Sequence, residues 1–120
     1  MHIEDFRDYC LAKKGVTEEL PFDEDTLVFK VGGKMFALCS ILEYRNGITL
    51  KCNPEKAVVL REHYPLLIKP GYHMNKVNWN TVLPEAGLPD DLIRSWIDDS
   101  YLLVATGLTK AIKAQYGIFL

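Results

Sequence analysis

The sequence predicts an α+β fold, a two-layer sandwich in which helices cover one face of a mainly antiparallel sheet. Three observations support this. Two β-rich runs meet at a pair of glycines, which indicates an antiparallel hairpin. Three other regions have apolar residues at helical spacing. Each of these helices has a single apolar stripe, so it is expected to cover a sheet.

The first helix is expected over residues 2–14, where apolar residues recur at helical spacing: Ile3, Phe6 and Cys10. Gly15 follows two lysines and is a typical C-terminal stop. Residues 16–25 hold Pro21 and an acidic cluster, and a short strand could precede that proline.

The hairpin gives the strongest structural signal in the chain. Strands are predicted at 26–31 and 34–40, because Gly32 and Gly33 between them can adopt the positive φ of a two-residue turn. A third strand is predicted at 48–52, after a turn at Asn46 and Gly47. Side chains alternate along a strand, so Lys51 and Lys30 are expected on the face away from the core. The outer face of the sheet is therefore expected to be partly basic.

The second helix is expected to begin at Asn53-Pro54-Glu55, which supplies a cap, a first-turn proline and a first-turn acid, and to end before Pro65. Two short strands are then predicted at 72–75 and 78–82. A last helix is predicted from Pro89 to Thr106, and Gly107 is its stop. Residues 109–120 have room for one more helical turn.

The elements therefore follow the order helix, three strands, helix, two strands, helix. The length of 120 residues suits one hydrophobic core but not two. We expect a single domain over 1–120, with its core in about 2–106 and a C-terminal extension at 107–120.

Four segments carry a family resemblance. They are DTLVFKVGGKMFAL at 25–38, LKCNPE at 50–55, PGYHMNKVNWNTV at 70–82 and LPDDLIRSWIDDSYLLV at 88–104. In these segments the chain resembles the MmcQ/YjbR-like family of small bacterial proteins. The resemblance implies a secretion-chaperone-like fold. It also implies possible DNA binding through a pair of β wings, as proposed for some members, and no firmly attached enzymatic activity.

The third of these segments holds a polar and aromatic cluster that the resemblance marks as a family motif: His73, Asn75, Trp79 and Asn80. Trp79 could stack on a planar ligand or fill the gap between the sheet and the last helix. His73 could contact a ligand or make a structural hydrogen bond. The asparagines could contact a ligand or bond the backbone of a tight loop, and Gly71 is expected to serve turn geometry.

Positive charge is concentrated in the middle of the chain. The formal net charge is −2, but residues 26–84 carry eight basic and three acidic side chains, whereas residues 1–25 carry three basic and eight acidic ones. Local potential rather than net charge attracts an anionic partner. The candidate nucleic-acid contacts are the lysines and the arginine of this region: Lys30, Lys34, Arg45, Lys51, Lys69 and Lys76. Lys34 and Arg45 lie beside the two predicted hairpin turns, which best reach a phosphate backbone.

No complete catalytic or metal-binding motif is present in the sequence. Cys52, His63 and His73 do not have the spacing of a metal site, and no cofactor is expected. The N-terminus lacks the features of a secretory signal, no apolar run is long enough to span a membrane, and the three cysteines are odd in number. These features predict a soluble, cytoplasmic protein.

The sequence thus favours a non-catalytic binding module with DNA as the first candidate partner. A protein-binding or chaperone-like adaptor is the alternative. A small-molecule site or an enzyme near His73 and Trp79 is a further alternative.

Overall fold

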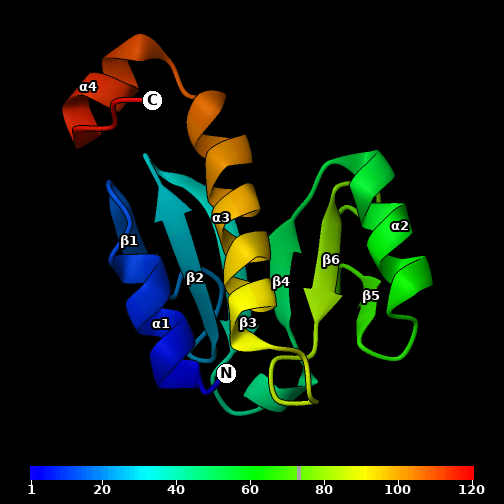
Figure 1. Cartoon of the computed structure of the whole chain (residues 1–120). Coiled ribbons are helices and arrows are strands. Elements are labelled where there is room, and N and C mark those ends of the chain that lie inside the picture. Colours follow the sequence, from blue (N-terminus) through cyan, green and yellow to red (C-terminus); the bar gives the residue numbers. More distant parts are fainter. Residues whose placement is uncertain (73) are drawn as a thin grey trace.

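A single antiparallel sheet organises the protein. The structure, a computed structural model, describes residues 1–72 and 74–120. Within that part of the chain the sheet has six strands in the order β1-β2-β3-β4-β6-β5 (Figure 1). The strands are β1 (Val16–Glu19), β2 (Thr26–Val31), β3 (Lys34–Ser40), β4 (Ile48–Lys51), β5 (Ile68–Pro70) and β6 (Trp79–Val82).

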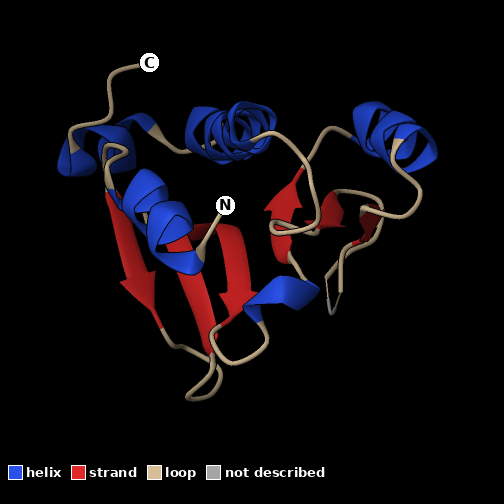
Figure 2. Cartoon of the chain, turned by 60° about the horizontal axis from the view of Figure 1, so that its bottom comes forward, coloured by secondary structure: helices blue, strands red, loops and turns tan. Residues whose placement is uncertain are grey.

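The helices lie on one side of this sheet, as Figure 2 shows. They are α1 (Ile3–Leu11), α2 (Pro54–His63), α3 (Asp90–Thr106) and α4 (Lys110–Tyr116), and a 3-10 turn η1 (Tyr44–Asn46) precedes β4. None of the helices in the described part of the chain covers the opposite face of the sheet. None of these described helices combines the length and the apolar character that crossing a membrane requires.

The core fills the space between the sheet and the helices. Phe6 of α1 packs edge-on against Phe29 of β2, with ring centroids 5.3 Å apart. On α3, Tyr101 packs in the same way against Phe36 at 5.6 Å. All three phenylalanines are fully buried, and burial of a large apolar side chain contributes about 2 kcal/mol to folding. The helices are therefore held chiefly by their apolar stripes.

A bulge in β3 is closed by a serine from α3. The pairing of β2 with β3 shifts between Phe29 and Lys30, and the described ladder between β3 and β4 ends at Ala37 and Leu50. The hydroxyl of Ser100 bridges the gap: it donates to the carbonyl of Phe36 at 2.5 Å and accepts from the N–H of Lys51 at 2.9 Å. Buried backbone groups are thus satisfied without a continuous ladder.

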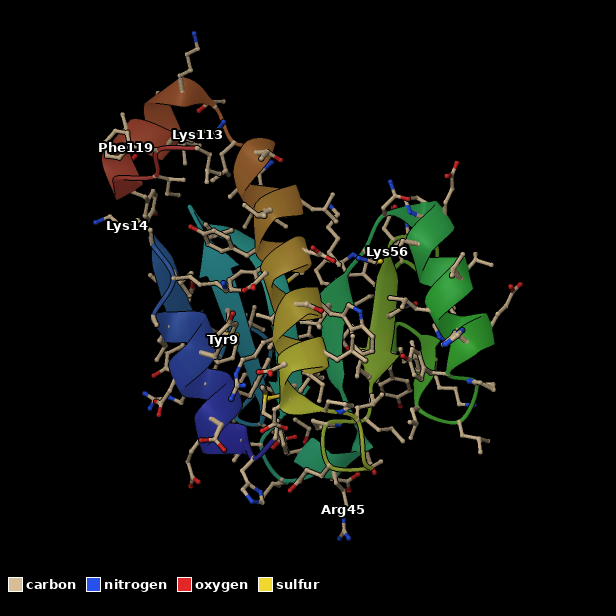
Figure 3. All side chains as sticks on the ribbon, in the orientation of Figure 1. Tyr9, Lys14, Arg45, Lys56, Lys113 and Phe119 are labelled. Atoms are coloured by element: carbon tan, nitrogen blue, oxygen red, sulfur yellow. The ribbon has the colours of Figure 1, made fainter. Side chains whose placement is uncertain are left out.

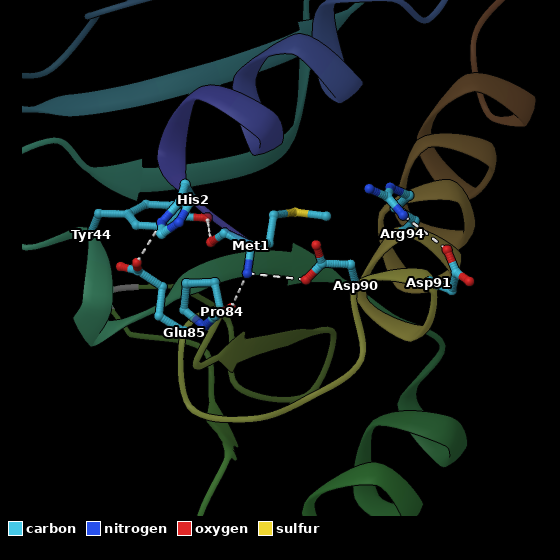
Figure 4. A network of polar contacts seen from close by, with 8 residues as sticks. All are labelled: Met1, His2, Tyr44, Pro84, Glu85, Asp90, Asp91 and Arg94. Carbon is cyan, nitrogen blue, oxygen red and sulfur yellow. Dashed lines mark hydrogen bonds and ion pairs between the residues drawn. The ribbon is translucent and has the colours of Figure 1, made fainter.

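Polar contacts tie the first residue to the start of α3 (Figure 4). The α-amino nitrogen of Met1 donates to the carbonyl of Pro84 at 2.7 Å and lies 3.1 Å from a carboxylate oxygen of Asp90. The hydroxyl of Tyr44 donates to the carbonyl of Met1 at 2.9 Å. The network therefore links α1, η1 and the loop before α3 at one end of the sheet.

The predicted fold class is confirmed, and so are the hairpin strands at 26–31 and 34–40. The first helix is shorter than predicted, and the short strand before Pro21 is present as β1. Leu27, Phe29 and Val31 face the core as predicted.

The strand predicted at 72–75 is wrong in its described part, because β5 lies earlier, at Ile68–Pro70. After β5 the chain makes local hydrogen bonds. The side chain of Asn75 accepts from the N–H of Val77 at 2.8 Å, and the backbone carbonyl of Asn75 accepts from the N–H of Asn78 at 3.3 Å. These local bonds replace those of a ladder and turn the chain back toward β6.

Candidate functional site

The uncovered face of the sheet is the candidate functional site, and the strand register decides which side chains it presents. Residues paired across antiparallel strands share a face, and side chains alternate along each strand. One row on this face runs across the sheet: Val28, Leu38, Thr49, Thr81 and Lys69. The next row toward the β2–β3 turn holds Lys30, Lys51 and Trp79. We call these two rows the open face.

A hollow of about 900 Å³ lies on the open face. Its floor comes from β3, β4 and β6, and its walls come from three loops, from β5 and from the first residue of β2. The residues that line it are Phe22, Asp23, Asp25, Thr26, Leu38, Cys39, Ser40, Leu42, Glu43, Asn46, Gly47, Thr49, Lys69, Pro70, Tyr72, Met74 and Thr81. The hollow therefore joins segments that are far apart in the sequence.

Two aspartates shape one wall of the hollow. The carboxylate of Asp25 accepts a hydrogen bond from the hydroxyl of Ser40 and another from the N–H of Leu42 at 2.7 Å. These bonds, the one from Ser40 first, hold the pKa of Asp25 below its ordinary value. Hydrogen bonds from the backbone N–H groups of Thr26 and Asp25 lower the pKa of Asp23 in the same way. Both carboxylates are therefore charged at neutral pH, and they hold the loops that they bond.

Two buried threonines meet in the floor. The hydroxyl oxygens of Thr49 and Thr81 are 2.8 Å apart, and the hydroxyl of Thr81 also accepts from the N–H of Tyr72 at 3.0 Å. Thr49 is 5% exposed and Thr81 is 8% exposed. The pair ties β4, β6 and the start of the loop after β5 together beneath the hollow.

Large apolar side chains stand exposed around the hollow. Phe22 is 65% exposed, Leu42 is 86% exposed and Tyr72 is 69% exposed. Each comes from a different loop, and all three line the hollow. Apolar groups that surround a concave surface in this way are typical of a binding site.

The structure brings together only part of the predicted cationic set. Lys30, Lys51 and Lys69 lie on the open face. Each is two strands away from the next, a distance of about 10 Å across the sheet. Lys30 is paired with Glu19 at 3.3 Å. The ammonium of Lys69 donates to the carbonyl of Pro65 at 2.6 Å.

The other three cations lie elsewhere. Lys34 pairs with Val31, whose face is the one that the helices cover, and Arg45 follows the far end of β3, about 20 Å along the strand. Figure 3 shows Arg45 at the lower end of the molecule. Lys76 lies in the loop before β6 and donates to the carbonyl of Gly71 at 3.2 Å. Lys34 and Arg45 are both beside turns, as predicted, but these two turns lie at opposite ends of the sheet.

The residues of the family motif divide between the two faces. Trp79 is 7% exposed but lies on the open face, so of its two predicted roles the one between the sheet and the last helix is wrong. Asn80, on the helix side, accepts from the guanidinium of Arg61 at 2.8 Å and donates to the carbonyl of Ala57 at 3.2 Å, which anchors α2. Asn75 bonds its own loop. The prediction for His73 lies outside the described residues.

Gly71 has a different role from the one predicted. A Cβ atom at this position would lie 2.6 Å from the Cβ of Trp79, so no side chain fits there. Because its φ is not among the positive values of the described glycines, close approach rather than turn geometry accounts for this glycine.

The three cysteines are buried free thiols, and burial raises the pKa of Cys39 to about 12. Among the described residues, no three His, Cys, Asp or Glu side chains are arranged to hold a metal ion.

Comparison with known proteins identifies the family. The YjbR family model matches residues 11–103. The chain belongs to the YjbR family. It is 46% identical over 90 residues to the uncharacterized protein YbdF of Escherichia coli O157:H7. The match covers 75% of this chain and 73% of YbdF. It is 35% identical over 101 residues to the uncharacterized protein YjbR of Escherichia coli K12. This match covers 84% of this chain and 85% of YjbR.

Two crystal structures are similar to this YjbR-family chain. Deinococcus radiodurans protein DR2400 superposes with a TM-score of 0.90 at 38% identity, over 98% of this chain and 88% of that one. A Pseudomonas syringae protein superposes with a TM-score of 0.73 at 33% identity, over 87% of this chain and 99% of that one. The fold of this chain is therefore also that of these two crystal structures.

The hollow includes Tyr72 and Met74, next to the small-molecule site that was one predicted alternative, but most of its lining residues were not predicted. Its acidic wall has a local signal, since Asp23 and Asp25 precede a strand and short acids in that position often bond the following backbone N–H groups. The threonine pair has no such signal, because its two residues meet only through the pairing of β4 with β6.

Proposed function

We propose that this YjbR-family protein is a non-catalytic module that binds nucleic acid through the lysines of its open face. The observation that carries the proposal is the register of Lys30, Lys51 and Lys69, which share the sheet face that the described helices leave uncovered. Together the three ammonium groups cover about 20 Å of the sheet, taking the usual spacing between strands. Lysines so spaced suit contacts to phosphates, which position a nucleic acid without selecting its sequence.

Two features limit the strength of such binding. Glu19 lies beside Lys30, and Asp23, Asp25 and Glu43 lie toward the other end of the face. Binding is therefore expected to depend on Lys51 and Lys69 more than on Lys30, and to weaken steeply with salt.

The test is a titration of fluorescein-labelled duplex and single-stranded DNA by fluorescence anisotropy at several salt concentrations. With two or three phosphate contacts, the slope of log affinity against log salt should be about −2 to −3 on the duplex. The double variant Lys51→Gln/Lys69→Gln should lose most of the affinity and reduce the slope by about two.

The matched control is Lys110→Gln/Lys113→Gln, which removes the same charge from α4 on the helix side. This control should leave DNA affinity near that of the unmodified protein. Equal losses in both double variants, or no binding at low salt, would show that the open face does not bind DNA.

A protein-binding adaptor is a second candidate, and the exposed side chains of Phe22, Leu42 and Tyr72 favour it. If they hold a partner, Phe22→Ser/Leu42→Ser should abolish its binding and leave DNA affinity unchanged. Light scattering on the purified protein would also show whether the partner is a second copy.

We also propose a cytoplasmic location. Its support is the presence of three free cysteines, since free thiols persist in reducing compartments.

A further inference from the structure

We propose that the hollow on the open face binds a small organic amine that has a flat apolar body and a hydrogen-bond acceptor. The proposal goes beyond nucleic-acid binding, because none of its steps depends on phosphate contacts. It rests on the size of the hollow, on the charges in its walls and on an unused hydroxyl proton in its floor.

The size and construction of the hollow suit a small molecule. Its volume of about 900 Å³ falls in the range of small-molecule sites, about 300–1,000 Å³. The floor is formed by paired strands, so its shape does not depend on the loops alone. Leu38 of β3 is half-buried there and offers an apolar surface next to the threonine pair.

The charges in the walls favour a cation. Three carboxylates line the hollow, those of Asp23, Asp25 and Glu43, against the single ammonium of Lys69. That ammonium already donates to the carbonyl of Pro65. The lowered pKa values of both aspartates keep their negative charges down to acidic pH. An amine is therefore attracted to this wall, and a carboxylate or phosphate of the same size is repelled.

The floor has one hydroxyl proton that none of its own hydrogen bonds uses. Thr49 and Thr81 carry two hydroxyl protons, and only one of these can lie between their two oxygens. The second bond at this site is donated by the N–H of Tyr72 and uses no hydroxyl proton. Among the described residues, the remaining proton therefore has no acceptor. Both threonines are more than nine-tenths buried and line the hollow, so a carbonyl, ether or hydroxyl oxygen of a ligand would accept this proton.

The rim favours a flat apolar body. Phe22 and Tyr72 present aromatic rings from two loops, and Leu42 stands on a third. A ring system held between such side chains gains burial and stacking while its amine faces the carboxylates.

The experiment uses two probes of the same shape and opposite charge, 5-methoxytryptamine and 5-methoxyindole-3-acetate, titrated into the 15N-labelled protein. The amine should shift the amide signals of Leu38, Thr49 and Thr81 and should saturate. The carboxylate should bind at least about tenfold more weakly, which corresponds to about 1.4 kcal/mol. Equal affinity for both probes, or no shifts at these amides at millimolar amine, would overturn the proposal.

Variants separate the two recognition elements. Glu43→Gln removes one charge from the wall and keeps the shape of the side chain, so amine affinity should fall about threefold to tenfold. Thr49→Val removes the hydroxyl and keeps the volume, so the preference for 5-methoxytryptamine over tryptamine should disappear.

The control is Glu55→Gln on α2, which changes the charge by the same amount on the helix side and should leave amine affinity unchanged. If Thr49→Val does not fold, the result for Glu43→Gln still decides the charge preference. An equal effect of Glu55→Gln and Glu43→Gln would contradict the site. Neither variant removes a lysine of the open face, so DNA affinity reports on the proposed function separately.

Discussion

Ser100 illustrates how one polar side chain can hold two structural layers together. It is fully buried, and its hydroxyl serves two backbone groups where β3 and β4 separate. A buried serine on a helix would ordinarily be replaced by alanine at little cost. Here the hydroxyl takes the place of missing ladder bonds, so the local geometry of the sheet depends on α3.

Replacing Ser100 with alanine should lower the free energy of unfolding by about 2 kcal/mol, because the carbonyl of Phe36 and the N–H of Lys51 lose their partner. Urea unfolding measures the change. Ser95→Ala on the same helix is the control, since the Ser95 hydroxyl is exposed and bonds only the carbonyl of Leu92. Its effect should stay within about 0.5 kcal/mol. Similar losses for both serines would contradict the bridging role.

Gly47 is a second position at which a single residue controls the site. Its φ is +138°, and a Cβ atom there would lie 2.2 Å from the Cγ2 of Thr81 in the floor of the hollow. Gly47→Ala should therefore destabilise the protein by about 3 kcal/mol, from backbone strain and from displacement of Thr81.

Gly87→Ala is the matched control for this prediction. Gly87 also has a positive φ, +106°, but no atom of the described residues lies within 4 Å of the added Cβ atom. It should show the backbone cost alone, about 1 kcal/mol. Thermal unfolding of both variants separates the two contributions, and equal shifts would mean that Thr81 imposes no steric limit.

At the scale of the element, local signals account for most boundaries. The glycine pair between β2 and β3 and the cap at Asn53 act only on the adjacent backbone. The predicted bounds of these elements therefore agree with the structure. The strand predicted at 72–75 shows the limit of such signals. Its residues have a suitable pattern, but the bonds of Asn75 and the contact of Gly71 with Trp79 turn the chain earlier.

The cap of α2 gives a prediction at this scale. The side chain of Asn53 accepts from the N–H groups of Glu55 at 3.0 Å and Lys56 at 3.4 Å. Asn53→Ala should lower stability by about 1 kcal/mol, whereas Asn53→Asp keeps the acceptor and should have little effect. Chemical denaturation of both variants is the measurement. Equal losses would show that the cap hydrogen bond is not the cause.

At the scale of the whole molecule, acid stability depends on carboxylates whose folded-state pKa is lowered. Hydrogen bonds lower the pKa of Asp25 and Asp23, and Arg7 lowers that of Glu18. The stabilisation from such groups is fully present above the unfolded-state pKa and is lost as the pH falls through the folded-state pKa. Stability should therefore decline from about pH 4 downward.

Asp25→Asn tests this expectation. The variant cannot gain a proton at this position, so its stability should fall less between about pH 4 and pH 2, although it starts from a lower value at pH 7. The melting temperature across this range is the measurement. Unchanged pH dependence in the variant would show that Asp25 does not contribute to acid unfolding.

The sequence by itself determined the fold class and most strand and helix bounds, because these depend on periodicity, caps and turns within a few residues. The family followed from the resemblance of four segments, and the family model that matches residues 11–103 shows it. Only the tertiary structure decided which cations share a face, where Trp79 is buried and that a hollow exists. Lys34 and Arg45 are separated by the length of β3, and Thr49 and Thr81 are joined by strand pairing. Such distances follow from register and topology, which bring together residues far apart in the chain. The local sequence pattern around each residue does not predict them.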